Sequence, residues 1–266
     1  MSAIMREAAR TIHPTALVDP AAELGPGVTV GPFSIVEAGA VIGAGCAIAS
    51  HVRIEGSVRM GPDNRVHQGA VLGSPPQDLK FRGEESWLEI GAGNVIREYA
   101  TLNRGTGEGE TTRVGDGCLL MAYTHVAHNC LLGSHIILGN SVNLAGHVTV
   151  EDHAIISGVV PVHQFVRIGT HSYIGGGSRV PQDMPPYLLG AGNPVVIVTG
   201  INAVGLQRRG FPRETLRALR HAYRLLYREG LNTSQALERI EAELADDPHV
   251  RRLADFVRAS ERGIMK

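Results

Sequence analysis

The sequence has few aromatic residues, few cysteines and no long apolar segment. Phe, Trp and Tyr make up 5% of the 266 residues, although 43% are hydrophobic, so a large core would have to be mainly aliphatic. No apolar run approaches the roughly 20 residues that a membrane-spanning helix needs, and residues 1–14 lack the continuous apolar stretch of a secretory signal. Three cysteines, an odd number, fit a reducing compartment. We therefore expect a cytoplasmic protein without stable membrane insertion.

Lysine is nearly absent, and the charges are unevenly distributed. Only Lys80 and Lys266 occur among 25 basic residues, which draws attention to Lys80. Residues 1–200 carry 12 basic and 17 acidic groups, a net charge of −5, whereas residues 201–266 carry 13 and 9, a net charge of +4. The acidic first part argues against nucleic-acid binding. The basic last part indicates either an acidic partner or a solvated surface.

A period of six residues runs through most of the chain. Between Ile12 and Val180 there are 29 positions whose number is a multiple of six, and 26 of them hold Ile, Leu, Val or Met. The exceptions lie in two polar stretches, near 74–89 and 103–113: Asp78, Glu84 and Glu108. We interpret these stretches as loops inserted without a change of phase. The cysteines all occur four residues after an aliphatic position, as small inward-facing fillers: Cys46, Cys118 and Cys130.

Each hexad resembles the unit of a left-handed parallel β-helix, in which three hexads form a triangular coil of about 18 residues. We therefore predict a mainly β fold, with a left-handed parallel β-helix of hexapeptide repeats over residues 1–190. A C-terminal α-helical domain is predicted over residues 191–266, where apolar residues recur at helical spacing in segments 212–230, 234–246 and 249–261. Such helices would cover the open end of the coil, as repeat proteins require.

The coil decides how to interpret two histidines that lie three residues apart, His125 and His128. Residues 18 apart should stack on adjacent coils, about 4.8 Å from each other. His128 therefore begins a column that includes, with chain neighbours, a further group of polar residues: Gly146, His147, His163 and Gln164.

Three interpretations of this histidine cluster stay open on the residues alone. A zinc site would need three or four ligands that converge on one point, and His125, His128 and His147 could supply them. Structural histidines on a polar surface would need no ligand at all. Acid–base chemistry is favoured, because an imidazole ordinarily titrates near pH 6.5 and a glycine N–H one coil away suits an oxyanion.

Six motifs occur in the order found in one family of transferases. They are QDLK (77–80), HVAHNC (125–130), LAGHV (144–148), VHQF (162–165), PPYLLGAGNP (185–194) and GLQRRGF (205–211). Through these motifs, its length and its helical end, the chain resembles the acyl-carrier-protein:UDP-N-acetylglucosamine O-acyltransferases of lipid A biosynthesis. The resemblance implies transfer of an (R)-3-hydroxyacyl chain from acyl carrier protein to the 3-hydroxyl of UDP-N-acetylglucosamine. It also implies a homotrimer with sites between subunits, no metal, and no cofactor beyond the carrier's phosphopantetheine.

The resemblance assigns roles to residues as well. It implies that His128 is the general base, that the Gly146 N–H stabilises the thioester oxyanion, and that Asp78 holds the sugar hydroxyls. The other residues are implied to bind the sugar, its phosphates or the phosphopantetheine: Gln77, Lys80, His125, His147, His163, Gln164, Asn202, Arg208 and Arg209.

The chain departs from the family pattern at two positions. Asn129 follows the expected base where a carboxylate is common, and Val204 stands where a Glu is common. Either change bears on the sugar nucleotide accepted, for example a 3-amino analogue. The alternatives are a related hexapeptide N-acyltransferase, a metal-dependent lyase of the carbonic anhydrase type and a non-catalytic scaffold.

Overall fold

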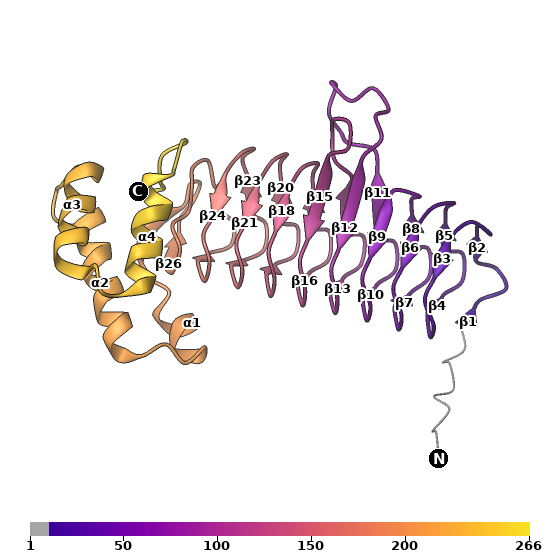
Figure 1. Ribbon diagram of the computed structural model, residues 1–266, viewed down its shortest axis with the longest axis horizontal. Coiled ribbons are helices and arrows are strands. Elements are labelled where there is room, and N and C mark those ends of the chain that lie inside the picture. The colour runs from indigo at the N-terminus through magenta and orange to yellow at the C-terminus, as the bar shows by residue number, and fades with distance from the viewer. Residues whose placement is uncertain (1–10) are drawn as a thin grey trace, which may run out of the picture.

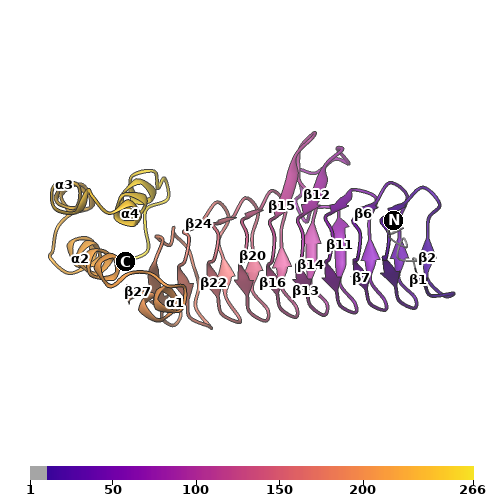
Figure 2. The same ribbon diagram turned by 60° about the horizontal axis from the view of Figure 1, so that its bottom comes forward.

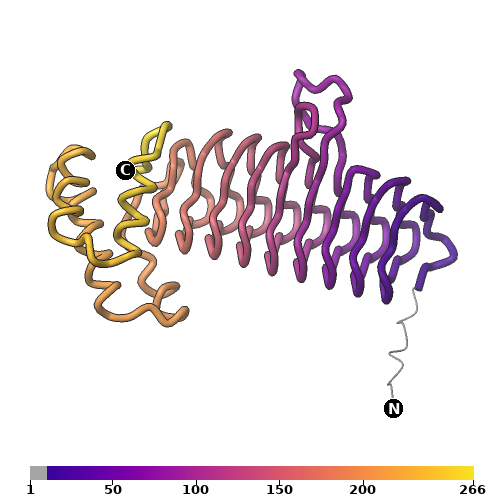
Figure 3. Tube along the Cα trace, viewed as in Figure 1, coloured from indigo at the N-terminus to yellow at the C-terminus, as the bar shows by residue number. Residues whose placement is uncertain are grey.

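The computed structural model describes residues 11–266, which form a long triangular coil with a group of helices at its C-terminal end (Figure 1). The tube trace shows the successive turns of the coil stacked side by side along the long axis of the molecule (Figure 3). The predicted mainly β fold, a left-handed parallel β-helix followed by helices, is confirmed.

Three sheets form the three sides of the coil. The first has eleven strands, in the spatial order β1 (Thr11–Ile12), β4 (Thr29–Val30), β7 (Ala47–Ile48), β10 (Arg65–Val66), β13 (Val95–Ile96), β16 (Leu119–Leu120), β19 (Ile137–Leu138), β22 (Ile155–Ile156), β25 (Tyr173–Ile174), β26 (Leu188–Ala191) and β27 (Ile197–Ile201). All neighbours in this sheet are parallel except the last pair, β26 and β27.

The other two sheets have eight strands each and are parallel throughout. The second has the order β2 (Leu17–Val18), β5 (Ile35–Val36), β8 (Arg53–Ile54), β11 (Val71–Ser74), β14 (Thr101–Asn103), β17 (His125–Val126), β20 (Asn143–Leu144) and β23 (Pro161–Val162). The third has the order β24 (Arg167–Ile168), β21 (Thr149–Val150), β18 (Leu131–Leu132), β15 (Thr111–Val114), β12 (Trp87–Ile90), β9 (Val58–Met60), β6 (Val41–Ile42) and β3 (Glu23–Leu24).

The strand register confirms that residues 18 apart are stacked, since His125 pairs with Asn143 and Asn143 with Pro161. Of the 26 aliphatic residues at multiples of six, 24 are buried, and the others, Ile12 and Val18, belong to the first coil of the described chain. Burying one such side chain is worth about 1.5–3 kcal/mol before chain entropy is subtracted. The three cysteines are buried, as predicted. Aliphatic ladders therefore build the core without aromatic residues.

Two loops leave the coil and rejoin it in phase. Residues 75–86 connect β11 to β12, and residues 104–110 connect β14 to β15; these connections project from the coil at the top of Figure 1. Val71 pairs with Thr101, 30 residues away, and Thr101 pairs with His125, 24 residues away. The loops thus add 12 and 6 residues to the usual 18, and the period of six survives both insertions.

Four helices cover the C-terminal end of the coil (Figure 2): α1 (Ala203–Arg208), α2 (Arg213–Tyr227), α3 (Thr233–Leu244) and α4 (Pro248–Arg258). The last three were predicted, whereas α1 was missed because six residues are too few to show a helical period. On α2 the helical spacing predicts that Leu226 and Tyr227, and not Leu225, belong to the buried stripe, and the structure differs. Leu225 is fully buried, whereas Leu226 and Tyr227 are only partly buried.

Polar contacts hold these helices against the coil. Arg167 of β24 donates a hydrogen bond to the C=O of Ala259 at 3.2 Å, and its guanidinium lies 4.4 Å from the ring centre of Phe256. Arg252 of α4 donates to Glu151 at 3.0 Å. Within residues 11–266, the helices are all too short or too polar to span a membrane.

Candidate active site

A pocket of about 660 Å³ lies at the corner where the second sheet turns into the third. Its walls come from loop 75–86 and from the turns that follow β17, β20 and β23 on three successive coils. Eight of the twelve residues that the sequence singled out line this pocket: Gln77, Asp78, Lys80, His125, His128, Gly146, His147 and Gln164. The stacking of residues 18 apart predicted that His128, Gly146 and Gln164 lie together, and the structure confirms it; Gln77, Asp78 and Lys80, which the resemblance implied, reach the same pocket from loop 75–86.

Asn129 determines which nitrogen of His128 carries the proton. Asn129 Oδ1 accepts a hydrogen bond from the backbone N–H of Thr106 at 2.9 Å, and its Nδ2 donates to the C=O of Thr106 at 3.3 Å. Because a backbone N–H can only donate and a C=O can only accept, the amide has one orientation. Its Oδ1 then accepts from His128 Nδ1 at 2.9 Å. The neutral imidazole is therefore protonated on Nδ1, and Nε2 keeps its lone pair.

The lone pair of His128 Nε2 faces the pocket. Nε2 lies 3.9 Å from Asp78 Oδ2, too far for a hydrogen bond, and the His128 side chain is 15% exposed. A general base needs a free lone pair, a fixed ring and access to the proton that it removes. His128 meets all three conditions.

Gly146 makes room for the His128 ring. A Cβ at Gly146 would lie 2.5 Å from Cε1 and 2.6 Å from Nε2 of His128, so even alanine would collide with the imidazole. Among the backbone hydrogen bonds of residues 11–266, the N–H of Gly146 donates to no acceptor. The backbone N–H of Gln164, at the equivalent position on the next coil, also donates to no backbone acceptor among these residues. The N–H of Gly146 differs in lying beside the base. This N–H is thus available to a substrate oxygen.

His125 and His147 flank the base. His125 Nδ1 lies 2.7 Å from Thr101 Oγ1, and burial, followed by the charge of His128, lowers the pKa of His125. The ring of His147 meets that of His128 edge-on at 5.2 Å and stacks on Phe165 at 4.6 Å. Burial and then the charge of His128 also lower the pKa of His147. Both rings therefore favour the neutral form. In His125 only Nε2 is then left for a ligand, because Nδ1 is bonded to Thr101.

The remaining four predicted residues lie outside the pocket. His163 Nδ1 is 3.2 Å from Arg262 Nη2. Asn202 is buried as the N-cap of α1, where Oδ1 accepts from the Gly205 N–H at 3.2 Å and Nδ2 donates to the C=O of His171 at 3.0 Å. Arg208 ends α1, and Arg209 follows it. One chain alone does not bring these residues to the pocket.

A second group of histidines occupies a different corner, between the third sheet and the first. We call His135, His153 and His171 the histidine ladder, because their rings stack with centres 5.0 and 4.7 Å apart. Arg209 donates to Nδ1 of His153 at 2.9 Å. Burial, then the charges of His153 and Arg209, lower the pKa of His171 to about 4. The imidazoles of the ladder thus contact one another and an arginine.

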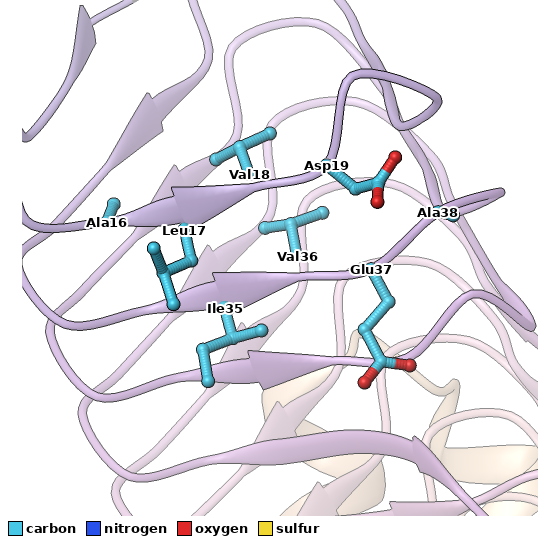
Figure 4. Close-up of a pocket in the computed structure, with 8 residues that line it drawn as sticks. All are labelled: Ala16, Leu17, Val18, Asp19, Ile35, Val36, Glu37 and Ala38. Carbon is cyan, nitrogen blue, oxygen red and sulfur yellow. The ribbon is translucent and has the colours of Figure 1, made fainter.

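Another hollow, of about 580 Å³, lies over β2 and β5 near the other end of the second sheet (Figure 4). Leu17 and Ile35 lie on the strands, and Asp19 and Glu37 lie beyond the strand ends (Figure 4). Glu37 pairs with Arg53. No histidine lines this hollow, so it offers less for acid–base chemistry than the pocket at His128. Within residues 11–266, no group of three or more His, Cys, Asp or Glu side chains is arranged to hold a metal ion.

Loop 104–110 contributes to the site in a way that the sequence did not indicate. Asn129 Nδ2 donates to Glu110 Oε2 at 3.1 Å, besides its two contacts with Thr106. The sequence indicated only that the period of six continues after this loop. That period places β15 next to β18, the strand that follows His128. Loop side chains follow no repeat, so their contacts were not predictable from the period of six.

Two protein-family models match the chain. The model of UDP N-acetylglucosamine O-acyltransferase, domain 2, matches residues 183–265, and the model of the bacterial transferase hexapeptide, six repeats, matches residues 21–56.

The chain is also similar to known protein sequences over most of its length. It is 51% identical over 250 residues to an acyl-[acyl-carrier-protein]–UDP-N-acetylglucosamine O-acyltransferase of Synechocystis sp., a match that covers 94% of this chain and 90% of that protein. It is 48% identical over 263 residues to the protein of the same name from Xanthomonas campestris pv. campestris, with coverage of 98% and 100%.

Solved structures of similar fold carry the same description. The UDP-N-acetylglucosamine acyltransferase of Francisella novicida matches with a TM-score of 0.93 and 38% identity, covering 96% of this chain and 94% of that one. The corresponding acyltransferase of Bacteroides fragilis matches with a TM-score of 0.89 and 44% identity, covering 97% and 98%.

Proposed function

The chain belongs to the family of acyl-[acyl-carrier-protein]–UDP-N-acetylglucosamine O-acyltransferases, and from this premise we propose how its side chains carry out the transfer. The protein is an acyltransferase of lipid A biosynthesis that acts on acyl carrier protein and UDP-N-acetylglucosamine. The donor carries an (R)-3-hydroxyacyl chain, and the acceptor atom is the 3-hydroxyl oxygen of the sugar.

The observation that carries this mechanism is the orientation of His128. Its Nε2 lone pair, held toward the pocket by the contact of Nδ1 with Asn129, takes the proton from the sugar hydroxyl as that oxygen attacks the thioester carbon. The C–S bond then breaks, and His128 returns the proton to the departing phosphopantetheine thiolate. The N–H of Gly146, which has no internal acceptor among the described residues, donates to the oxyanion between these steps.

The pocket walls provide the contacts for the sugar nucleotide. Asp78 faces the base across 3.9 Å and accepts hydrogen bonds from the sugar hydroxyls. Gln77 and Lys80 from the same loop, with His125, His147 and Gln164 from the coil, bind the sugar and its phosphates.

The working molecule is a homotrimer in which a second subunit completes the pocket. The positions of His163, Arg208 and Arg209, which lie outside the pocket of their own chain, support this proposal. Closed cyclic symmetry would bring the edge with Arg208 and Arg209 of one subunit to the pocket of the next. There the guanidinium groups would face the diphosphate or the phosphopantetheine. Asn202 would contribute by holding α1.

The reaction needs no cofactor beyond the phosphopantetheine that the acyl carrier brings. The three free, buried cysteines suit a reducing compartment, so the enzyme would work in the cytoplasm. The basic C-terminal part, with a net charge of +4 over residues 201–266, suits an acidic carrier protein.

The test is acyl transfer with purified acyl carrier and UDP-N-acetylglucosamine. His128→Ala should lower kcat by about 10²- to 10⁴-fold, the usual contribution of a general base. His135→Ala, which removes an imidazole from the ladder, is the matched control and should stay near wild type. A His128→Ala enzyme that keeps more than about a tenth of the turnover would remove His128 from this role.

A second acceptor deserves direct comparison because Asn129 presents a neutral amide to His128. A 3-amino sugar nucleotide would be acylated on nitrogen, and its amine needs less help from a base than a hydroxyl does. Competition between the two nucleotides at equal concentration, read by mass spectrometry, decides between them. Predominant N-acylation would replace the hydroxyl as the acceptor and leave the fold and donor unchanged.

A further inference from the structure

The amide of Asn129 connects the His128 ring to a carboxylate on a different loop. On one side Oδ1 accepts from His128 Nδ1 at 2.9 Å, and on the other side Nδ2 donates to Glu110 Oε2 at 3.1 Å. Thr106 fixes the amide between them through its N–H and C=O. Asn129 is 9% exposed, whereas Glu110 is exposed to solvent. The three groups form one continuous hydrogen-bonded chain.

Hydrogen bonding in this chain has a fixed direction. Glu110 accepts from the amide nitrogen, which makes the amide oxygen a better acceptor for the Nδ1–H of His128. A positive charge on the ring strengthens both bonds, because negative charge then lies at the far end of the same chain. The arrangement therefore favours the protonated imidazole that forms during general-base catalysis.

Other charged groups also face His128 and must be separated from this effect. Asp78 approaches Nε2 from loop 75–86, His125 lies three residues before it on β17, and His147 meets it from the next coil. Lys80 and Glu110 complete the set and act on the same cluster. Only Glu110 reaches the ring through the Nδ1 side.

We propose that Asn129 and Glu110 are a positioning pair for the base: Asn129 holds the His128 ring and its tautomer, and Glu110 supplies negative charge to that ring through the Asn129 amide. This inference rests on the proposed role of His128. Neither residue lines the pocket, so both would act through the imidazole. Their effect should fall on kcat and on the pH dependence, with KM for either substrate unchanged.

The first experiment removes only the charge at the end of the chain. Glu110→Gln keeps an acceptor for Asn129 Nδ2 but is neutral, so the acidic inflection of the pH–rate profile should move down by about 0.3 pH unit at low ionic strength. Glu108→Gln is the matched control, because it removes the same charge from the same loop and Glu108 has no side-chain contact with Asn129 among the described residues. Its profile should coincide with that of the wild type.

The second experiment changes the amide. Asn129→Asp places a carboxylate directly against the ring, so the inflection should rise by about 1 pH unit, while the new charge opposes Glu110. Adding Glu110→Gln to this variant removes the opposition, and the two changes should therefore be non-additive. Asn129→Gly suits the left-handed backbone at this position, where φ is 58°, but removes the amide. It should lower kcat about 10-fold or more, as a loosely held base does.

A measurement without turnover completes the test. In ¹⁵N-histidine spectra of the full-length protein, assigned with His128→Ala, the neutral His128 ring should show its proton on Nδ1. In Asn129→Gly it should shift toward the Nε2-protonated form. The role of Glu110 would be overturned if Glu110→Gln and Glu108→Gln had the same pH–rate profile and the effects of Asn129→Asp and Glu110→Gln were additive. An unchanged tautomer in Asn129→Gly would overturn the role of Asn129. If His128→Ala remained active, the proposed role of His128 as the base would fail instead.

Discussion

The same stretch of coil carries two groups of three histidines, and one of these groups lines the pocket of about 660 Å³. His125, His128 and His147 lie at one corner beside loop 75–86, whereas the ladder of His135, His153 and His171 lies at another. The backbone is alike at both corners. Asn129 and His147 have φ of 58° and 61°, and His135 and His153 have 58° and 63°.

What distinguishes the two corners is what each imidazole contacts. In the ladder the rings stack on one another, and Arg209 donates to Nδ1 of His153, so that nitrogen has no lone pair left for a substrate. At the pocket Asn129 contacts Nδ1 of His128, and Gly146 leaves the space beside Nε2 open. A histidine in such a cluster is thus a candidate base when a partner orients one ring nitrogen and the other ring nitrogen faces open space.

The largest effect in this comparison is expected at Gly146. Gly146→Ala would place a Cβ 2.5 Å from the His128 ring and displace it, so we expect kcat to fall about 10²-fold, as for a base misplaced by about 1 Å. Gly200→Ala is the control, since a Cβ there meets nothing within 4 Å, and it should be nearly silent. Steady-state kinetics of both variants gives the answer, and near-normal turnover of Gly146→Ala would mean that open space at Nε2 does not distinguish the corners.

The second prediction concerns whether the ladder corner serves another subunit. His128→Ala and Arg209→Ala should each be strongly impaired as pure proteins. In mixed trimers a site with both intact residues can form between subunits, so a refolded 1:1 mixture should recover about a quarter of wild-type activity. The assay is turnover per total protein, with separately refolded variants as controls. No recovery would place Arg209 outside the site of the neighbouring subunit.

The third prediction uses the acid sensitivity of the ladder. The pKa of His171 is lowered from 6.5 to about 4 in the folded protein, so between these values the unfolded chain binds a proton that the folded chain does not. Stability is therefore fully present above pH 6.5 and is lost as the pH falls toward 4. With allowance for the half-exposed ring, the loss is about 1–2 kcal/mol.

His171→Phe isolates this effect, because it keeps an aromatic ring in the ladder but cannot be protonated. Thermal unfolding at pH 7.5 and at pH 4.5 should show a smaller drop in Tm for the variant than for the wild type. Equal drops in both proteins would show that the acid sensitivity arises elsewhere, for example at the pocket histidines.

The smallest effect is expected in a third region, the exposed face of α2, which belongs neither to the pocket nor to the histidine ladder. Arg213, Arg217 and Arg220 are all exposed there, and an acidic carrier would be steered by them. Replacing all three with Ala should raise KM for the acyl carrier about 3- to 10-fold and weaken its salt dependence. KM for UDP-N-acetylglucosamine should not change; a rise in that value alone would assign this surface to the other substrate.

Arg239→Ala is a suitable control for the triple variant. Arg239 lies on α3 and pairs with Glu229 and Glu243, so its charge is already balanced locally. Its removal should leave the carrier's KM and salt dependence close to wild type.

Most of the fold was predictable because the coil repeats. Each multiple of six specifies an inward-facing side chain, and the stacking of residues 18 apart follows from three hexads per coil, which is why the His128–Gly146–Gln164 column could be drawn from numbers alone. Asp78 and Glu108, polar residues at positions where the repeat expects an aliphatic one, located both loops. Helix α1 carried no such signal, since one and a half turns show no period.

The contacts made by loops and helix ends were not predictable, because no repeat constrains them. The resemblance implies that Asn202 binds substrate, which stays a prediction; its role as the N-cap of α1 and its bond to the C=O of His171 had no signal in the sequence. Asn129 was noted only as a departure from the carboxylate that is common at this position, and its contact with Nδ1 of His128 was not predicted. Glu110 could not be connected with His128 before the path of loop 104–110 was known.

Loops 75–86 and 104–110 leave and rejoin the coil in phase. Their length and sequence can therefore change in related proteins without altering how the strands of the coil pair. His128 and Gly146 lie on the turns of the coil, whereas Asp78, Lys80 and Glu110 lie on the two loops. Sequence changes can therefore act on the two parts separately. The base and its oxyanion donor belong to the coil, whereas the acceptor contacts and the charge of Glu110 can vary with the loops.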